Sequence, residues 1–370
     1  MLDVDLDRFW RDDELAHAEN CFSPRAPQAA LGIRMSGECV FTELGVEGNP
    51  WEEPPRERRL ELNKRYNDKA ERIVGKRLLP EDLPAPDEIF PPLRKIGEVF
   101  GGRYVTAGGT EWLLASCSSP QELERMLDRV ERLDLRSFVL PPDWEAEKRR
   151  IFETYGKRPE PWRHVRGPVT LAASLYGAEN LVYLIHDHPD LARRFSRAIS
   201  DVIFGYASLM DAEAGFAPGE APGGFAFSDD HCCLLNPEMY ELFGYPVLSR
   251  IFAAFSPRPG DERYQHSDSA MGHLLPILGR LNLTGCNFGP TVLVDEIRRH
   301  MPRTRIDGCL APFTFMRGDE REIVAEVRRD CAMAREGRGL NVSTAGSIND
   351  GSTLVSMRAV MYAIQQYGRY

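Results

Sequence analysis

The 370 residues of the chain, 42% of them hydrophobic and 28% charged, are enough to bury a large core and exclude a disordered protein. The net charge of −10, without a long run of Lys or Arg, argues against binding to nucleic acid or to an anionic membrane, and favours a small-molecule or protein partner. No signal peptide, no apolar run of about 18 residues and no disulfide framework among the eight cysteines is evident. We therefore expect a cytoplasmic protein with reduced thiols.

The first 105 residues are rich in proline and charge, and we assign them to an N-terminal extension together with the first part of the fold. Their patterns predict one strand near Val40–Val46 and one helix near Arg58–Val74. Residues 106–370 are expected to form the main body of a single domain, because α/β barrels of more than about 250 residues fold as one unit.

From Ser119 onward, short β-rich runs alternate with amphipathic helical runs. A capping-box spacing at Ser119 and a proline at the first helical position predict a helix that continues to about Leu135. Asn236 and Pro237 begin another helix in the same way. Strands are expected near Val165–Ser174, Gly224–Ser228, Arg263–His266, Asn282–Cys286, Arg305–Cys309 and Leu340–Ser343, and further helices over Thr291–Met301, Asp319–Arg335 and Thr353–Gln366.

Six strand–helix units in succession predict an α/β fold with a parallel sheet. If the irregular N-terminal extension supplies two more strands, the sheet closes into a (β/α)8 barrel of TIM type, with eight parallel strands. An open, doubly wound sheet is the alternative, but no Gly-x-Gly-x-x-Gly turn follows an early strand. We predict the barrel, with its active site at the carboxyl ends of the strands.

Polar and ligand-type residues follow the predicted strands at the points where they end. These positions share one rim of a barrel, so residues far apart in sequence are expected to face one pocket. The residues are Asp229, Asp230 and His231 after one strand, His266 and Asp268 after the next, then Cys286 with Asn287, Cys309, and finally Ser343, Gly346 and Ser347.

The pair His266 and Asp268 suggests a metal site or an acid–base pair. Residues two apart in an extended segment face the same side, so an imidazole and a carboxylate can meet one ion or one substrate. Cys286 and Cys309 end the next two strands at equivalent heights, and one nitrogen, two sulfurs and a carboxylate suit zinc. Alternatively, Asp268 caps a helix, His266 makes an internal hydrogen bond and the cysteines fill the core.

Two further segments carry candidate site residues. Asp229, Asp230 and His231 form the densest cluster of carboxylates and imidazole, and repulsion between adjacent carboxylates would raise the pKa of one of them for acid–base work. A solvated loop is the alternative. The Gly- and Ser-rich segment 343–351 either offers backbone N–H groups to a carboxylate or phosphate or forms a plain turn. The candidate cofactor-binding residues are Ser343, Gly346, Ser347 and Asn287.

Several of these motifs resemble the uroporphyrinogen decarboxylase superfamily over about residues 160–370. The resemblance implies a barrel enzyme and favours a homodimer. The segments that carry it are Arg166-Gly-Pro-Val-Thr-Leu-Ala, the pair Asp229 and Asp230 followed by Leu235-Asn-Pro-Glu-Met-Tyr and Pro246, the strand end His266-Ser-Asp, and Asn287-Phe-Gly-Pro.

Two branches of that superfamily imply different chemistry. The haem-pathway decarboxylases carry an N-terminal Arg-Gln-Ala-Gly-Arg segment that binds porphyrinogen carboxylates, and residues 1–110 contain nothing similar apart from the lone Arg34. The corrinoid-linked methyltransferases hold zinc with a His-x-Cys motif and a later Cys. Here His266 matches the histidine, but Asp268 replaces the first Cys, and Ala345-Gly-Ser stands where Gly-Cys-Gly is expected.

We therefore predict a methyltransferase that acts on a small methylated substrate with a corrinoid protein as partner, since the chain lacks a corrinoid-binding Asp-x-His-x-x-Gly motif. A decarboxylase of a small organic acid or porphyrinogen-like substrate, and an inactive ligand-binding barrel, are the alternatives. Either zinc held by His266, Cys286, Cys309 and Asp268 activates the substrate, or His266, Asp268 and Asp230 act as acid–base groups without a metal.

Overall fold

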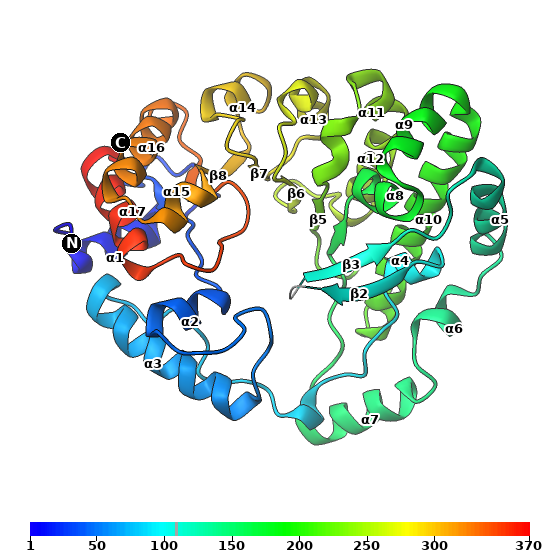
Figure 1. Ribbon diagram of the computed structural model, residues 1–370, viewed down its shortest axis with the longest axis horizontal. Helices are drawn as coiled ribbons and strands as arrows, with labels where there is room; N and C mark the ends of the chain where they lie inside the picture. Colours follow the sequence, from blue (N-terminus) through cyan, green and yellow to red (C-terminus); the bar gives the residue numbers. More distant parts are fainter. Residues whose placement is uncertain (108–109) are drawn as a thin grey trace. The chain divides into compact units, whose positions relative to one another are not determined.

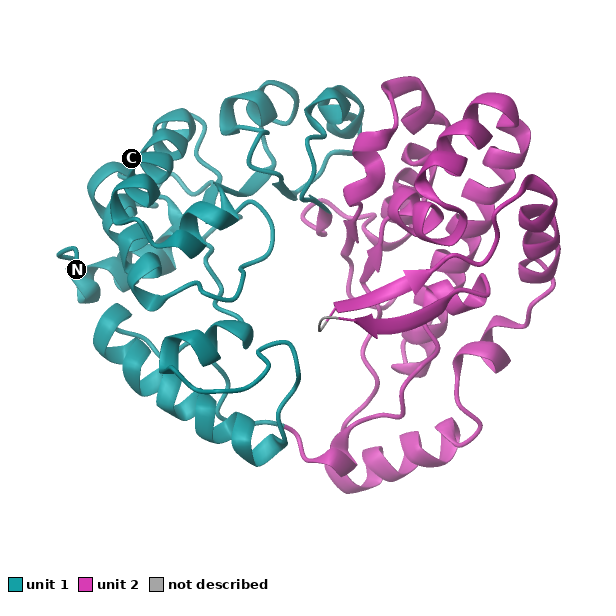
Figure 2. Ribbon diagram, in the orientation of Figure 1, with its two compact units in different colours: residues 1–83, 265–370 teal, residues 84–264 magenta. Residues whose placement is uncertain are grey.

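The computed structural model describes residues 1–107 and 110–370, and the chain divides into two compact units (Figure 2). Unit 1 comprises Met1–Leu83 and Gln265–Tyr370, and unit 2 comprises Pro84–Tyr264. Strands alternate with helices along most of the chain, which makes it an α/β protein (Figure 1). In the described residues, no helix is both long and apolar enough to span a membrane.

The strands of unit 1 follow the order β1-β9-β8-β7-β6. β1 (Ala30–Leu31) pairs in parallel with β9 (Leu340–Thr344), β9 with β8 (Arg305–Leu310), and β8 with β7 (Gly285–Phe288). β6 (Arg263–Ser267) begins two residues before the boundary of the unit and continues into it. Because parallel strands end at the same edge of a sheet, the residues that follow β7, β8 and β9 emerge together.

Several helices of unit 1 begin at residues whose side chains accept a backbone N–H of the first turn. Asp319 accepts a hydrogen bond from the backbone N–H of Arg321 at 2.8 Å, and Thr353 accepts one from that of Ser356 at 3.2 Å. The helices are α1 (Leu6–Ala16), α2 (Glu38–Leu44), α3 (Arg56–Val74), η3 (Gly272–Leu274), α13 (Leu275–Leu278), η4 (Gly279–Leu281), α14 (Val294–His300), α15 (Pro312–Arg317), α16 (Glu320–Ala334) and α17 (Leu354–Tyr367).

Unit 2 contains one parallel pair of strands and one separate hairpin. β4 (His164–Arg166) pairs with β5 (Phe225–Ser228), whereas β2 (Arg103–Ala107) and β3 (Thr110–Leu114) pair antiparallel. The helices are η1 (Pro86–Glu88), α4 (Ile96–Val99), α5 (Pro120–Val130), α6 (Leu135–Val139), α7 (Trp144–Tyr155), α8 (Pro168–Tyr176), α9 (Ala178–Asp187), α10 (Pro189–Glu213), η2 (Asp230–Leu234), α11 (Pro237–Phe243) and α12 (Tyr245–Phe255).

Two of the predicted strands need correction. The segment predicted as a strand near Val40–Val46 is helix α2, whose buried residues are three and four apart and whose Glu43 accepts the backbone N–H of Leu354. The strand predicted over Val165–Ser174 stops at Arg166, because the proline that follows Gly167 begins α8. Outside the hairpin, the described residues contain seven strands, one fewer than predicted, since α2 takes the place of a strand.

The remaining predicted elements agree with the structure apart from their bounds. The strand expected at Asn282–Cys286 is shifted toward the C-terminus and begins at Gly285, because Asn282 has a positive φ and ends the short helix η4. The assignment of residues 1–105 to an extension and 106–370 to one main body stays a prediction.

Candidate functional site

The ends of β6 and β7 bring three polar side chains of unit 1 together. His266 and Asn287 are the next-to-last residues of their strands, and Asp268 follows β6. His266 Nδ1 lies 2.8 Å from Asn287 Oδ1, and His266 Nε2 lies 3.1 Å from Asp268 Oδ1. The two-residue spacing thus places the imidazole and the carboxylate in direct contact, with each nitrogen of the ring facing an oxygen.

Asn287 joins this pair to the two strands beyond β7. Its Nδ2 donates to the backbone carbonyl of Thr344 in β9 at 2.9 Å and also to that of Asp307 in β8. Its side chain is buried, whereas the side chain of His266 is 22% exposed and that of Asp268 is 50% exposed. The pair therefore opens to solvent on the Asp268 side and is anchored in the sheet on the Asn287 side.

Gly346 leaves room for Asp268. A Cβ atom at this position would lie 2.5 Å from Asp268 Oδ1, and its φ of +118° is rare for other residues. Of the four candidate cofactor-binding residues, Asn287 and Gly346 contact the pair itself, Ser343 is half-buried in β9 and Ser347 is exposed. Their binding of a cofactor stays a prediction.

The two cysteines do not join His266. Adjacent residues of a strand point to opposite faces, so Cys286 points away from the face on which Asn287 meets His266, and Arg298 of α14 is among the charges that act on its thiol. Burial, and next to it the nearby Asp330 of α16, raise the pKa of the Cys309 thiol.

Burial raises the pKa of both thiols far above their usual range. Among the described residues, neither sulfur lies within 4.8 Å of the ligand atoms of both His266 and Asp268. Zinc binding by His266, Cys286, Cys309 and Asp268 stays a prediction. At the end of β6, the His266–Asp268 pair itself offers a cation one nitrogen and one carboxylate.

Asp229 of unit 2 is a buried anchor for helix α8. Its Oδ1 accepts the backbone N–H of Thr170 at 2.7 Å, and a Cβ at Gly167 would lie 2.2 Å from the Cβ of Asp229. Burial raises the pKa of Asp229 to about 6, and the charge of the adjacent Asp230 adds a smaller contribution in the same direction. The direction of this shift agrees with the sequence argument, but its main cause is desolvation.

Asp230 and His231 begin the short helix η2 and are both half-buried. The backbone N–H of His231 donates to the Thr170 hydroxyl at 3.0 Å. Within the described part of the chain, His231 Nδ1, Asp229 Oδ2 and the Tyr240 hydroxyl are buried without a hydrogen-bond partner. Sequence reasoning missed Thr170 and Tyr240, although the Gly-Pro-x-Thr spacing places the Thr170 N–H in the first turn of α8.

Comparisons with known proteins give a family and a structural similarity. The sequence profile of the family described as Uroporphyrinogen decarboxylase (URO-D) matches residues 164–367, more than half of the chain. A solved methyltransferase from Methanosarcina mazei is similar over 96% of this chain and 98% of that chain, with a TM-score of 0.59 and 16% sequence identity. At this identity the similarity concerns the fold. None of the curated protein sequences matches the chain.

Proposed function

The chain belongs to the uroporphyrinogen decarboxylase family, and from this premise we propose that it transfers a methyl group from a small methylated substrate with a corrinoid protein as its partner. The fold is the α/β barrel of TIM type on which this family is built, and barrel enzymes carry their chemistry at the carboxyl ends of the strands. The His266–Asp268 pair lies at such an end, and this contact is the observation that carries the proposal.

The pair can supply the proton that methyl transfer requires. When the bond between the methyl carbon and its oxygen, nitrogen or sulfur breaks, the electron pair stays on that heteroatom, which then needs a proton. An imidazolium at His266 can donate this proton from Nε2, while Asp268 stabilises the charged ring. A corrinoid, when its carrier protein is bound, supplies the nucleophile that accepts the methyl group.

The acid–base form of the reaction has better support than the zinc form. The thiols of Cys286 and Cys309 are buried, and in the described residues neither sulfur is grouped with both His266 and Asp268. His266 and Asp268, in contrast, already meet at hydrogen-bond distance. A group of this kind contributes about 10²–10⁴-fold to a reaction rate.

Decarboxylation is the second candidate, because the matching profile carries that description. The same imidazolium could protonate the carbanion that remains after loss of CO2. A porphyrinogen with several carboxylates would require cationic side chains near His266. Arg305 is the first residue of β8, so it does not lie at the carboxyl end of its strand, and it is paired with Asp307 at 2.8 Å, which favours the methyl-transfer reaction.

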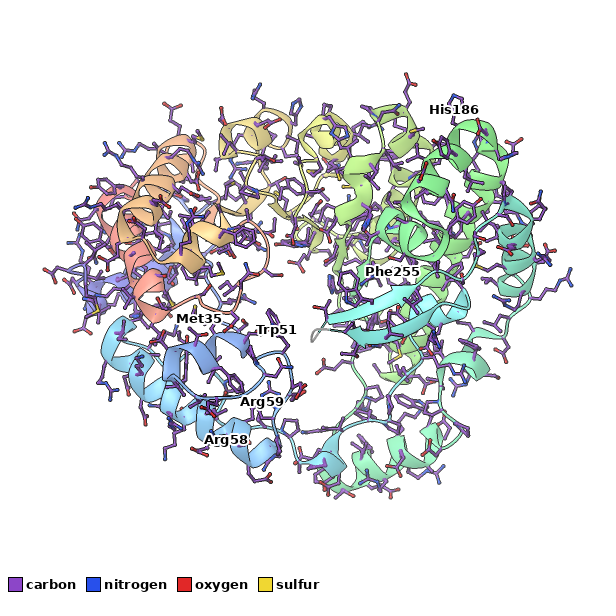
Figure 3. All side chains as sticks on the ribbon, viewed as in Figure 1. Met35, Trp51, Arg58, Arg59, His186 and Phe255 are labelled. Carbon is purple, nitrogen blue, oxygen red and sulfur yellow. The ribbon has the colours of Figure 1, made fainter. Side chains whose placement is uncertain are left out.

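The test is to mix the purified chain with cob(I)alamin and a panel of O-, N- and S-methylated compounds, and to follow methylcobalamin by its absorption spectrum. We expect methyl transfer with at least one compound class and its loss in His266→Gln. His186→Gln is the matched control, because His186 also contacts a carboxylate, Asp187 at 2.7 Å, but is 78% exposed on the outside of α9 (Figure 3). CO2 release from carboxylic acids without any methyl transfer would favour decarboxylation instead.

A further inference from the structure

The amide of Asn287 has only one orientation that satisfies its surroundings. Its Nδ2 faces two backbone carbonyls, those of Thr344 at 2.9 Å and of Asp307, and a carbonyl oxygen only accepts hydrogen bonds. A rotated amide would place its oxygen against both carbonyls and its NH2 against the ring of His266. The Oδ1 atom must therefore be the one that faces His266 Nδ1 at 2.8 Å.

This orientation decides which ring nitrogen of His266 carries hydrogen. Because an amide oxygen has no hydrogen to give, Nδ1 must be the donor in its contact with Asn287. We infer that Asn287 is a positioning residue that holds His266 in the Nδ1–H form, so that Nε2 is the nitrogen that gains and loses the reactive proton. The role of Nε2 in catalysis rests on the proposed function, whereas the assignment of the Nδ1–H tautomer does not.

The backbone makes this restraint rigid. The two carbonyls that hold the Asn287 amide belong to β8 and β9, and β8 and β9 pair in parallel along Ile306 to Leu310. The Asp307 side chain is itself fixed by Asn341 at 2.9 Å and Arg305 at 2.8 Å. Neither carbonyl can turn away without disturbing the sheet. The Asn287 amide therefore keeps its orientation, and its Oδ1 atom stays opposite Nδ1 of the His266 ring.

The other ring nitrogen, Nε2, is then the one that exchanges a proton. With Nδ1 always protonated, a neutral ring would direct the lone pair of Nε2 at the Asp268 carboxylate, 3.1 Å away, which is unfavourable. A proton on Nε2 removes this repulsion and gives an imidazolium that can be delivered to a leaving heteroatom. The proton lost from Nε2 returns from solvent, and the Nδ1–H bond to Asn287 stays unchanged through the cycle.

The experiment is long-range ¹H–¹⁵N NMR on the full chain labelled with ¹⁵N-histidine. The signals of His266 are identified among those of the eight histidines by their loss in His266→Gln. At a pH where the ring is neutral, we expect the wild type to show hydrogen on Nδ1 and not on Nε2. An Nε2–H form in the wild type would overturn the inference, and this spectrum requires no variant of Asn287 to fold.

Variants separate positioning from general damage. Asn287→Ala should populate both tautomers of His266, because it removes the acceptor opposite Nδ1. Asn341→Ala is the matched control, since this amide donates to Asp307 Oδ1 from the same sheet, and it should leave the tautomer unchanged. An unchanged tautomer in Asn287→Ala, or a changed one in Asn341→Ala, would contradict the role of Asn287.

A failure of this inference can be told apart from a failure of the proposed function. A wild-type ring in the Nδ1–H form, in a protein that transfers no methyl group to cob(I)alamin, would overturn the proposed function and leave the positioning by Asn287 intact. Methyl transfer by a protein whose His266 carries hydrogen on Nε2 would do the reverse.

Discussion

The two aspartates that follow β5 and β6 have opposite environments. Asp229, after β5 in unit 2, is completely buried and bound to the backbone of α8. Asp268, after β6 in unit 1, is 50% exposed and contacts an imidazole that is itself held from behind by Asn287. The same residue type at equivalent strand ends thus supports the fold in one unit and is available for chemistry in the other. Hydrogen-bond partners, more than position along a strand, separate these roles.

The largest expected effect is on the rate of methyl transfer, at the histidine that contacts Asp268. His266→Gln should lower the rate of methyl transfer by about 10²–10⁴-fold, because it removes the proton donor. The free energy of unfolding should change by about 1 kcal/mol or less, since the ring is partly exposed. Kinetics with cob(I)alamin and urea unfolding measure the two quantities. Equal losses of activity in His266→Gln and His186→Gln would remove the distinction between the two histidine–aspartate pairs.

The next effect concerns the space that Gly167 leaves for Asp229. Gly167→Ala should reduce the free energy of unfolding by roughly 2–3 kcal/mol, because the new Cβ would overlap the Cβ of Asp229. A Cβ atom is fixed to the main chain, so the overlap can be relieved only by a shift of the backbone. Urea unfolding tests this, with Gly37→Ala as the control, since a Cβ at Gly37 meets no atom within 4 Å. Equal stability of the two variants would show that Asp229 is not tightly packed against α8.

Asp229 should also make the stability of the fold depend on pH. Its pKa of about 6 in the folded chain lies above the usual value, so the folded state binds the proton more tightly than the unfolded state. The contribution is therefore present at low pH and is lost as the pH rises from about 4 through 6, by at most roughly 3 kcal/mol. Asp229→Asn should lack this loss. Urea unfolding of both proteins between pH 4 and pH 7.5 checks the sign, and parallel curves would contradict it.

The smallest effect is expected for the cysteines. Cys286→Ala and Cys309→Ala should each cost about 1–2 kcal/mol of stability through the cavity that they leave, without a change in methyl transfer or in bound zinc. Activity assays and metal analysis of the purified variants measure this. Loss of both zinc and activity in either variant would show that the thiol is a zinc ligand of the active site.

The sequence allowed the capping residues and most strands to be predicted because these signals are local. Ser119 and Asn236 both cap helices as expected. The role of Cys286 was not predictable in the same way, because a shift of the strand to Gly285–Phe288 decides which face each residue takes. The burial of Asp229 depends on Gly167 and Thr170, which are about 60 residues away in the chain and gave no local signal. The contact of His266 with Asp268 followed from spacing alone, but its support by Asn287 required the arrangement of β7, β8 and β9.

Methyl transfer by the wild-type chain after treatment with a chelator tests the central claim most directly, because it separates proton transfer by His266 from metal chemistry. The chain is stripped of metal, its zinc content is measured, and the formation of methylcobalamin from cob(I)alamin is followed before and after zinc is restored. We expect the stripped protein to keep its full rate and added zinc not to raise it. Loss of the rate on stripping, with recovery on addition of zinc, would contradict metal-free proton transfer by His266 and assign the reaction to a metal held at His266 and Asp268.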